Sequence, residues 1–398
     1  GILLCTGIVY TFSVFAGPLA ELRGWAVPDI MMAFAINSAV GPIPMIFGGY
    51  FTDRGWAKWI ARIGVVLFGI SFAFTGQATS IFQLYLIYGI FGGFAQNFAY
   101  SACLSNTIRF FPDKKGLASG LITGGMGGAA IIAAPIANAL IERYGVSQAF
   151  WRMGLAYALV GFFFSLFIRS APKQAVPQTA VASEKAPAPA KTITANKNWK
   201  EMLASPAFYL LILMFAMGAF SGLMIASNAS LIGQSMFGLS ASAAAAYVSL
   251  YSLSNTSGRV FWGAISDRIG QIRAVIIIYS AIIFAFILLV SVNQVWAFAI
   301  GIVTLGLCFG GVMGVFPGLV MDNFGPANQG VNYGIVFIGF SSAAFVAPKV
   351  TASLAAANDG DFTKAFYVAI AVVLLGLGLS LVYAKRKTEA KLAAELVK

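Results

Sequence analysis

The sequence contains no histidine, only three cysteines and few charged residues, which make up 10% of the chain. Without histidine, the usual catalytic triads and histidine-based metal sites are excluded, and any proton transfer must use another group. Cys5, Cys103 and Cys308 all lie in apolar stretches and show no paired spacing, which predicts free thiols. The phosphate-cradling loop of ATPases is also missing. We therefore expect neither an enzyme nor a bound cofactor or metal.

The shortage of charge also defines the solvent of the chain. Soluble domains carry about 25% charged residues, whereas this chain is 59% hydrophobic with a mean hydropathy of +0.85. Charge-free runs such as 274–292 are long enough to span a bilayer. The net charge of +12 would suggest nucleic acid in a soluble protein. Here the basic residues cluster in short loops and the tail, so we expect a lipid bilayer as partner and no nucleic acid.

Apolar segments divide the chain into two sets of six. We expect an all-α membrane protein with twelve transmembrane helices in two pseudo-symmetric six-helix bundles. Residues 1–170 form the first bundle, 171–205 a cytoplasmic linker, 206–384 the second bundle and 385–398 a cytoplasmic tail. The chain opens inside a short apolar stretch, so we expect a truncated first helix and missing N-terminal residues. The Pro- and Ala-rich linker predicts a flexible connection ending in a short amphipathic helix near Trp199–Leu203.

The two sets repeat each other at a constant spacing. Asp267 follows Asp53 by 214 residues, and the pairs Gly49 and Gly263, Gly116 and Gly330, and Gly120 and Gly334 have the same spacing. Four anchors at one spacing are unexpected by chance, which indicates an internal repeat.

Basic residues are concentrated in alternate loops, and this pattern predicts orientation. One side carries Arg54, Lys58, Arg62, Arg109, Lys114, Lys115, Lys173, Lys185, Lys191, Lys197, Lys200, Arg268, Arg273 and the tail residues Lys385, Arg386, Lys387, Lys391 and Lys398. The opposite loops hold only Arg23, Arg143, Arg152 and Lys364. We expect a multi-pass protein of the inner (plasma) membrane with both termini in the cytoplasm.

Arg259 lies about two turns inside a predicted span, 244–268. An arginine at that depth costs about 2.5–3.5 kcal/mol on insertion scales, so it normally faces a cavity or a partner. No Asp or Glu lies in the middle of any predicted span. Arg259 is therefore predicted to bind the anionic part of a transported substrate. Ser252 and Asn255 share its helical face and would contact substrate, orient Arg259 or bond between helices.

The sequence Gly-x-x-x-Asp-Arg occurs after the second and eighth spans of this repeat. It resembles the signature of the major facilitator superfamily, over the whole chain. The resemblance implies alternating access by a functional monomer. It also implies that Asp53, Arg54, Asp267 and Arg268 gate the cytoplasmic side.

Four motifs resemble bacterial oxalate–formate antiporters more closely, and with them bacterial monocarboxylate transporter homologues. They are GIVYTFSVFAGP from Gly7, RFFPDKKGLASG from Arg109, NYG from Asn332 and RVFWG from Arg259. The resemblance implies that Arg259 binds a carboxylate. It also implies a substrate-binding site formed with residues at matching positions, namely Tyr10, Tyr100, Met126, Phe309 and Met313.

Two positions depart from these families. Phe340 stands where the oxalate–formate antiporters carry a second cation, a lysine, so the site retains one positive residue. Animal monocarboxylate transporters have the same arginine, but Asn255 replaces their acidic residue one helical turn earlier. The first departure predicts a small organic anion with one carboxylate and an apolar remainder. The second argues against an arginine–aspartate proton mechanism.

The function that we expect is transport of small monocarboxylates of the lactate or pyruvate type, coupled to a proton. Because no mid-span Asp, Glu or His is present, the proton would move on the substrate or through release of Arg259 from it. The alternatives are exchange of organic anions of the oxalate–formate type and a non-transporting membrane receptor.

Overall fold

The structure, a computed structural model, describes residues 1–171 and 196–396. Within these ranges it is helical almost throughout and contains no strand. Six helical segments form the first half. They are α1 (Ile2–Thr6), η1 (Gly7–Thr11) and α2 (Phe12–Arg23); α3 (Val27–Ala39) and α4 (Pro42–Phe51); α5 (Ala57–Thr75) after η2 (Thr52–Trp56); α6 (Ile81–Leu84), η3 (Tyr85–Gly92) and α7 (Gly93–Phe110); α8 (Lys115–Gly127) and α9 (Ala129–Tyr144) after η4 (Pro112–Lys114); and α10 (Val146–Ser165).

The second half begins with the short helix expected at the end of the linker, α11 (Trp199–Leu203), which starts with a capping box of Asn198 and Glu201. Its spans are α12 (Pro206–Phe237), α13 (Ala241–Ile269), α14 (Gln271–Ser291), α15 (Val295–Phe324), α16 (Gln329–Ala356) and α17 (Thr363–Leu396). Each of the twelve expected spans thus corresponds to one helical segment. Helix α17 runs on through the first part of the predicted tail, whereas most of the linker lies outside the described residues.

Eight helical segments among the described residues are long and apolar enough to cross a membrane, and one of them, Val27–Thr75, includes two expected spans. The remaining expected spans contain α7, α10 and α13, whose sequences are more polar. In α7 and α13 several of the polar side chains are directed inward, since Gln96, Ser101, Asn255 and Arg259 are all buried. This is the arrangement expected where polar residues face the protein interior rather than lipid.

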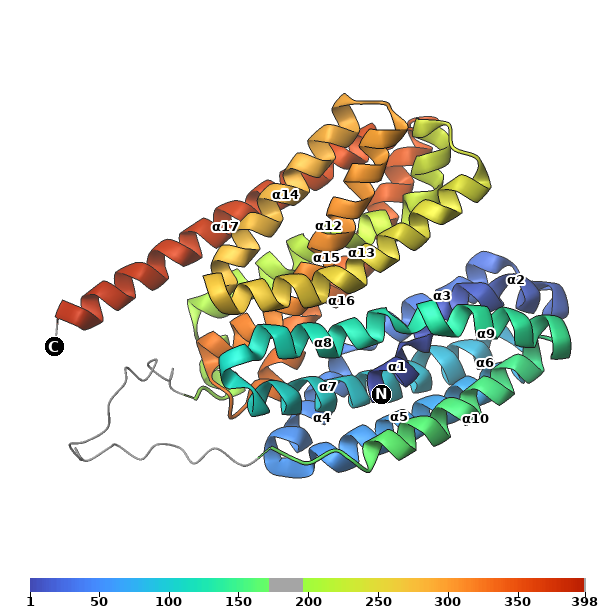
Figure 1. The fold of residues 1–398 in the computed structure, drawn as a ribbon, viewed down its shortest axis with the longest axis horizontal. Coiled ribbons are helices and arrows are strands. Elements are labelled where there is room, and N and C mark those ends of the chain that lie inside the picture. The colour runs from blue at the N-terminus through green and yellow to red at the C-terminus, as the bar shows by residue number, and fades with distance from the viewer. Residues whose placement is uncertain (172–195, 397–398) are drawn as a thin grey trace.

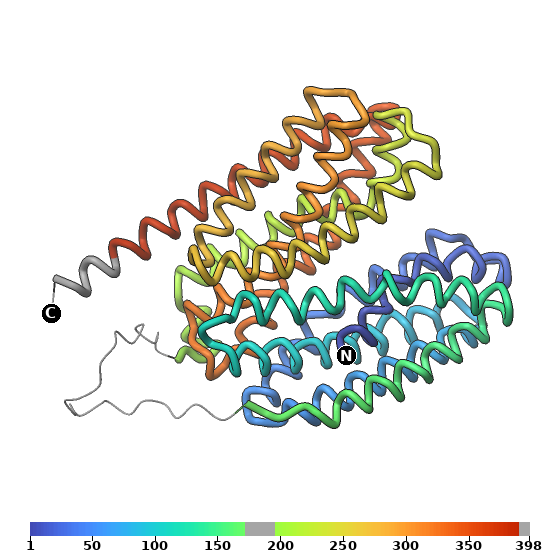
Figure 2. The backbone as a smooth tube through the Cα atoms, viewed as in Figure 1, coloured from blue at the N-terminus to red at the C-terminus, as the bar shows by residue number. Residues whose placement is uncertain are grey.

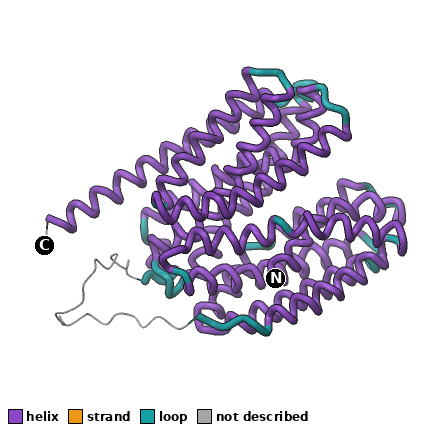
Figure 3. Tube along the Cα trace, viewed as in Figure 1, coloured by secondary structure: helices purple, strands orange, loops and turns teal. Residues whose placement is uncertain are grey.

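The two halves form separate bundles that meet at the end where the linker joins them and diverge toward the opposite end (Figures 1 and 2). Loops gather at these two ends, as Figure 3 shows. Where the bundles meet, their backbones touch. A Cβ on Gly49 would lie 2.2 Å from the carbonyl carbon of Gly330, and a Cβ on Gly263 would lie 2.3 Å from the carbonyl oxygen of Gly116. The two pairs are related by the 214-residue repeat, so the same contact closes the linker end twice.

We predict that Gly49→Val separates the bundles at the linker end, because no larger side chain fits against the Gly330 backbone. Spin labels at the exposed residues Lys58 and Arg268, one in each half, should then lie farther apart, as measured by double electron–electron resonance. Gly378→Val is the matched control, since no described atom lies within 4 Å of a Cβ at that position. An unchanged distance distribution in Gly49→Val would contradict this view of the closed end.

Candidate functional site

Arg259 lies at the centre of the candidate site, with 4% of its surface exposed. Its Nε donates a hydrogen bond of 3.0 Å to Oδ1 of Asn255, and its Nη1 donates one of 2.8 Å to the backbone oxygen of Thr123 in the other half. In the described part of the chain no carboxylate lies within ion-pair distance of this guanidinium. Its hydrogen-bond partners are neutral, so no described residue compensates the positive charge.

Glycines enclose the backbone of Arg259 on two sides. A Cβ on Gly120 of α8 would lie 2.2 Å from the Arg259 carbonyl oxygen. On the other side, a Cβ on Gly314 of α15 would lie 2.5 Å from that oxygen, and one on Gly310 would lie 2.8 Å from the Arg259 nitrogen. Only glycine permits these helices to approach so closely. The α13 backbone is therefore fixed at Arg259 by close packing on both bundles.

Three tyrosines lie close enough to Arg259 for its charge to act on their hydroxyls: Tyr100, Tyr251 and Tyr333. The hydroxyl of Tyr251 donates a hydrogen bond of 2.7 Å to the backbone oxygen of Gly222. The hydroxyls of Tyr100 and Tyr333 are buried and lie next to each other, and neither bonds to any other described residue. A bond between these two hydroxyls can use only one of their O–H groups, so the site contains one cation and at least one neutral group that is free to donate.

An aromatic wall lies beside these groups. The ring of Phe340 stacks on Phe337 with centroids 4.7 Å apart and lies parallel to Phe309 at 6.5 Å. Phe337 in turn lies 6.2 Å from Tyr100 and 5.9 Å from Tyr333. Phe340, expected to replace a lysine, is therefore part of an apolar surface that can receive an apolar group.

The structure brings most of the expected substrate-binding residues to this region. Asn255 contacts Arg259 directly. Met126 and Met313 are buried, one helical turn beyond Thr123 and Phe309. Tyr10 is 39% exposed and near enough to Tyr100 to interact with it electrostatically. Ser252 differs: it is exposed and its hydroxyl bonds to the backbone of Val248, so nothing in its contacts links it to Arg259.

The two gating aspartates bind the opposite bundle. Asp267 accepts hydrogen bonds of 2.8 Å from the backbone nitrogens of Gly116 and Leu117. Asp53 accepts bonds of 3.0 and 3.1 Å from those of Gly330 and Val331. Each carboxylate therefore lies at the N-terminus of a helix, α8 or α16, where unpaired N–H groups and the helix dipole favour negative charge.

The two arginines that were expected to gate with them make other contacts in this state. Arg54 bonds to the backbone of Tyr50 and stacks on its ring, and Arg268 is exposed. Two other basic residues, near the loop after the fourth span, form the ion pairs of this end, one with Asp53 and one with Asp322. Arg109 lies 3.8 Å from Asp53, and Lys115 forms an ion pair with Asp322 of the other half.

Sequence reasoning did not assign site roles to Thr123, Phe337, Tyr333, Arg109 or Lys115. Thr123 acts through its backbone, which no side-chain pattern reveals. The contacts of the aspartates had a usable signal, however. Asp53 and Asp267, like Gly116 and Gly330, are 214 residues apart, so either contact implies the other.

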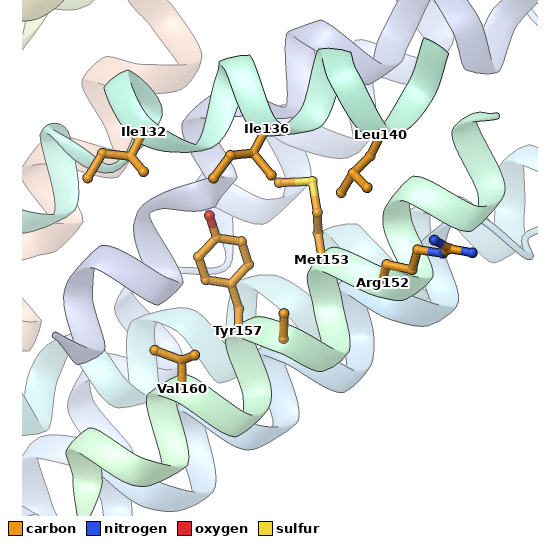
Figure 4. A pocket seen from close by; sticks show the side chains of 8 residues that line it. Ile132, Ile136, Leu140, Arg152, Met153, Tyr157 and Val160 are labelled. Carbon is orange, nitrogen blue, oxygen red and sulfur yellow. The ribbon is translucent and has the colours of Figure 1, made fainter. Parts of the chain in front are cut away.

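A cavity of about 440 Å³ lies away from Arg259, between α9 and α10 (Figure 4). Apolar side chains such as Ile132, Ile136 and Val160 line it, with Arg152 as its one charged lining residue among those described. Its position on the outside of the first bundle, within two neighbouring helices, makes it unsuitable as a transport pathway between the halves.

Comparison with known proteins adds to this geometry. The family model described as Major Facilitator Superfamily matches residues 1–348. An uncharacterised MFS-type transporter of Escherichia coli, YhjX, is 31% identical, with 84% of this chain and 81% of that protein covered. The oxalate:formate antiporter of Oxalobacter formigenes is 27% identical (89% and 80% covered), and human monocarboxylate transporter 11 is 24% identical (87% and 72%). The fold also matches the crystal structure of the human organic anion transporter MFSD10, with a TM-score of 0.70 at 15% identity, covering 95% and 97%.

We predict that Asp267→Asn weakens the closed end, because the carboxylate loses its charge and one of two acceptor oxygens. Hydrogen bonds to charged groups contribute about 1.5–3 kcal/mol, so opening should become roughly tenfold or more frequent. The measurement is the alkylation rate of a cysteine at buried Ser119, in a variant without the three native cysteines, which are all buried. Asp113→Asn, at an exposed carboxylate nearby, should leave the rate unchanged. Equal rates in the two variants would exclude a closing role for Asp267.

Proposed function

The chain belongs to the major facilitator superfamily of membrane transporters, and we propose that it carries small monocarboxylates of the lactate or pyruvate type. The observation that carries this proposal is the buried guanidinium of Arg259, which has neutral protein partners and no carboxylate within ion-pair distance among the described residues. A buried charge is stable only when it is paired. A substrate carboxylate supplies the missing charge, and a planar guanidinium can hold it with two parallel hydrogen bonds.

The surroundings of Arg259 support a substrate with a single carboxylate. Phe340 contributes an aromatic face to the wall with Phe309 and Phe337, where a second cation would be needed for a dicarboxylate. Such a wall favours the apolar remainder of the molecule. Two relatives, an oxalate:formate antiporter and a monocarboxylate transporter, are named for small carboxylates.

Transport would follow from rocking of the two bundles about Arg259. In the present state the linker end is closed by the glycine contacts and by Asp53 and Asp267, while the bundles diverge at the other end (Figure 1). With the linker in the cytoplasm of an inner-membrane protein, this state faces outward. The substrate would enter from this side, bind Arg259, and leave after the linker end opens. A monomer is sufficient for this cycle.

Proton coupling needs a carrier other than an acidic side chain in the spans. Arginine keeps its charge, and Asn255 bonds Arg259 as a neutral amide. The proton would therefore travel with the substrate carboxylate or join it as Arg259 releases it. Exchange of one anion for another is the second candidate, favoured by the similarity to the oxalate:formate antiporter.

We predict that Arg259→Gln reduces counterflow of labelled lactate in proteoliposomes by at least about thirtyfold. Removing one partner of a buried hydrogen-bonded charge pair costs about 2–5 kcal/mol. Arg259→Lys should fall between, because it keeps the charge but not the planar pair of donors. Arg152→Gln, outside the candidate site, should transport normally. Undiminished counterflow in Arg259→Gln would rule out this site.

Symport and exchange differ in what they require inside the vesicle. We predict that external lactate makes the medium outside empty proteoliposomes more alkaline, because a proton enters with each substrate. Oxalate should compete weakly for labelled lactate, since only one cation is present at the site. Uptake only into vesicles preloaded with an anion, without a pH change, would favour exchange instead.

A further inference from the structure

Tyr333 is 1% exposed, and its buried hydroxyl has no hydrogen-bond partner among the described residues other than the hydroxyl of Tyr100. The hydroxyl of Tyr100, 2% exposed, is in the same condition. A buried donor or acceptor that stays unpaired costs about 1–3 kcal/mol. Both hydroxyls lie near the charge of Arg259 and next to each other, and a hydrogen bond between them uses one of their two O–H donors and leaves the other unpaired. This cost would be recovered if a ligand bound beside Arg259.

The two hydroxyls come from opposite halves of the protein, Tyr100 from α7 and Tyr333 from α16. Phe337 lies between their rings, at 6.2 Å from one and 5.9 Å from the other, and Phe215 lies 6.3 Å from Tyr333. The rings are thus held by packing, and apart from each other the two hydroxyls have no hydrogen-bond partner among the described residues. A group held in this way is available to a ligand.

Tyr251 shows that the absence of a partner is not general near Arg259. The same charge acts on its hydroxyl, and it is also buried, at 4% exposed. However, it donates to the backbone oxygen of Gly222. Within one region, therefore, one tyrosine hydroxyl is bonded to the backbone, and the other two have no partner among the described residues except each other. Tyr251 serves as the matched control for the other two.

We propose that the Tyr333 hydroxyl, with that of Tyr100, binds the oxygen on carbon 2 of a 2-hydroxy or 2-oxo monocarboxylate whose carboxylate is held by Arg259. This inference rests on the proposed function and names the residue that distinguishes substituted from unsubstituted acids. The hydroxyls are neutral, which suits a neutral oxygen next to the carboxylate better than a second carboxylate. A tyrosine can donate to either an alcohol or a ketone oxygen and accept from the alcohol. The wall of Phe309, Phe337 and Phe340 receives the alkyl group.

Such a site discriminates by its unpaired groups. A pocket built to bond a substrate oxygen rejects the analogue that lacks it, because its own polar groups then stay buried and unpaired. An apolar pocket alone distinguishes similar acids far less. The wild-type protein should therefore prefer lactate and pyruvate over propionate, which has the same carbon chain but no oxygen on carbon 2.

The experiment is competition of L-lactate, pyruvate and propionate against labelled lactate in counterflow, with Tyr333→Phe, Tyr100→Phe and Tyr251→Phe. We expect Tyr333→Phe to weaken lactate and pyruvate about tenfold and to leave propionate unchanged, so that the preference is lost. Tyr100→Phe should act in the same direction, and it keeps the test informative if thermal unfolding shows that Tyr333→Phe is misfolded. Tyr251→Phe should affect the three acids alike.

The inference is overturned if Tyr333→Phe and Tyr100→Phe, both folded, change the three acids equally or not at all. It is also overturned if the wild type does not prefer lactate over propionate. These outcomes leave the proposed function intact, because lactate is still carried and still depends on Arg259. Failure of the proposed function looks different: the wild-type protein then carries no labelled lactate.

Discussion

A buried arginine whose charge has no acidic partner among the described residues is the constraint on which the rest of the structure depends. Arg259 is 4% exposed, and its hydrogen bonds go to an amide oxygen and a backbone carbonyl. Neutral acceptors hold the guanidinium in place without cancelling its charge. The surrounding glycines fix the backbone, and the aromatic wall keeps the neighbouring surface apolar. Each feature strengthens the binding of an anion beside Arg259, because a charge interaction is stronger where water is excluded.

The same helices connect the site to the closed end. Arg259 and Asp267 both belong to α13, about 12 Å apart along the helix at 1.5 Å per residue. Tyr333 lies less than one turn of α16 after Gly330, whose backbone N–H donates a hydrogen bond to the Asp53 carboxylate. The repeat makes the closed end symmetric, yet the site is not: Met45 occupies the position in the first half that corresponds to Arg259. The single charged residue of the site is therefore connected to both symmetric contacts, through α13 to one and through α16 to the other. Substrate binding can bias both contacts together.

Sequence reasoning reached the fold because its signals are local. Charge-free runs of membrane length, a repeat with a fixed spacing and the loops of basic residues require no knowledge of packing. The role of Arg259 could also be predicted from the sequence, since an unpaired charge in an apolar span has few explanations. The contacts of Ser252 could not be predicted, because a shared helical face does not decide whether a hydroxyl bonds to a ligand or to its own helix. In the structure this hydroxyl bonds to its own helix. The motif also did not show what the aspartates bind: each accepts hydrogen bonds from backbone nitrogens of the opposite half, which the 214-residue repeat relates to each other but does not identify. Tyr333 emerged only from the accounting of buried hydrogen-bond partners.

The most direct measurement is calorimetric binding of L-lactate and of lactamide to the purified protein. The two molecules have nearly the same shape, but lactamide carries no charge. If the substrate supplies the counter-charge of Arg259, lactate should bind at least about thirtyfold more tightly than lactamide, in keeping with the roughly 2–5 kcal/mol of a buried hydrogen-bonded charge pair. Equal affinity for the two, or no binding of lactate, would contradict this account.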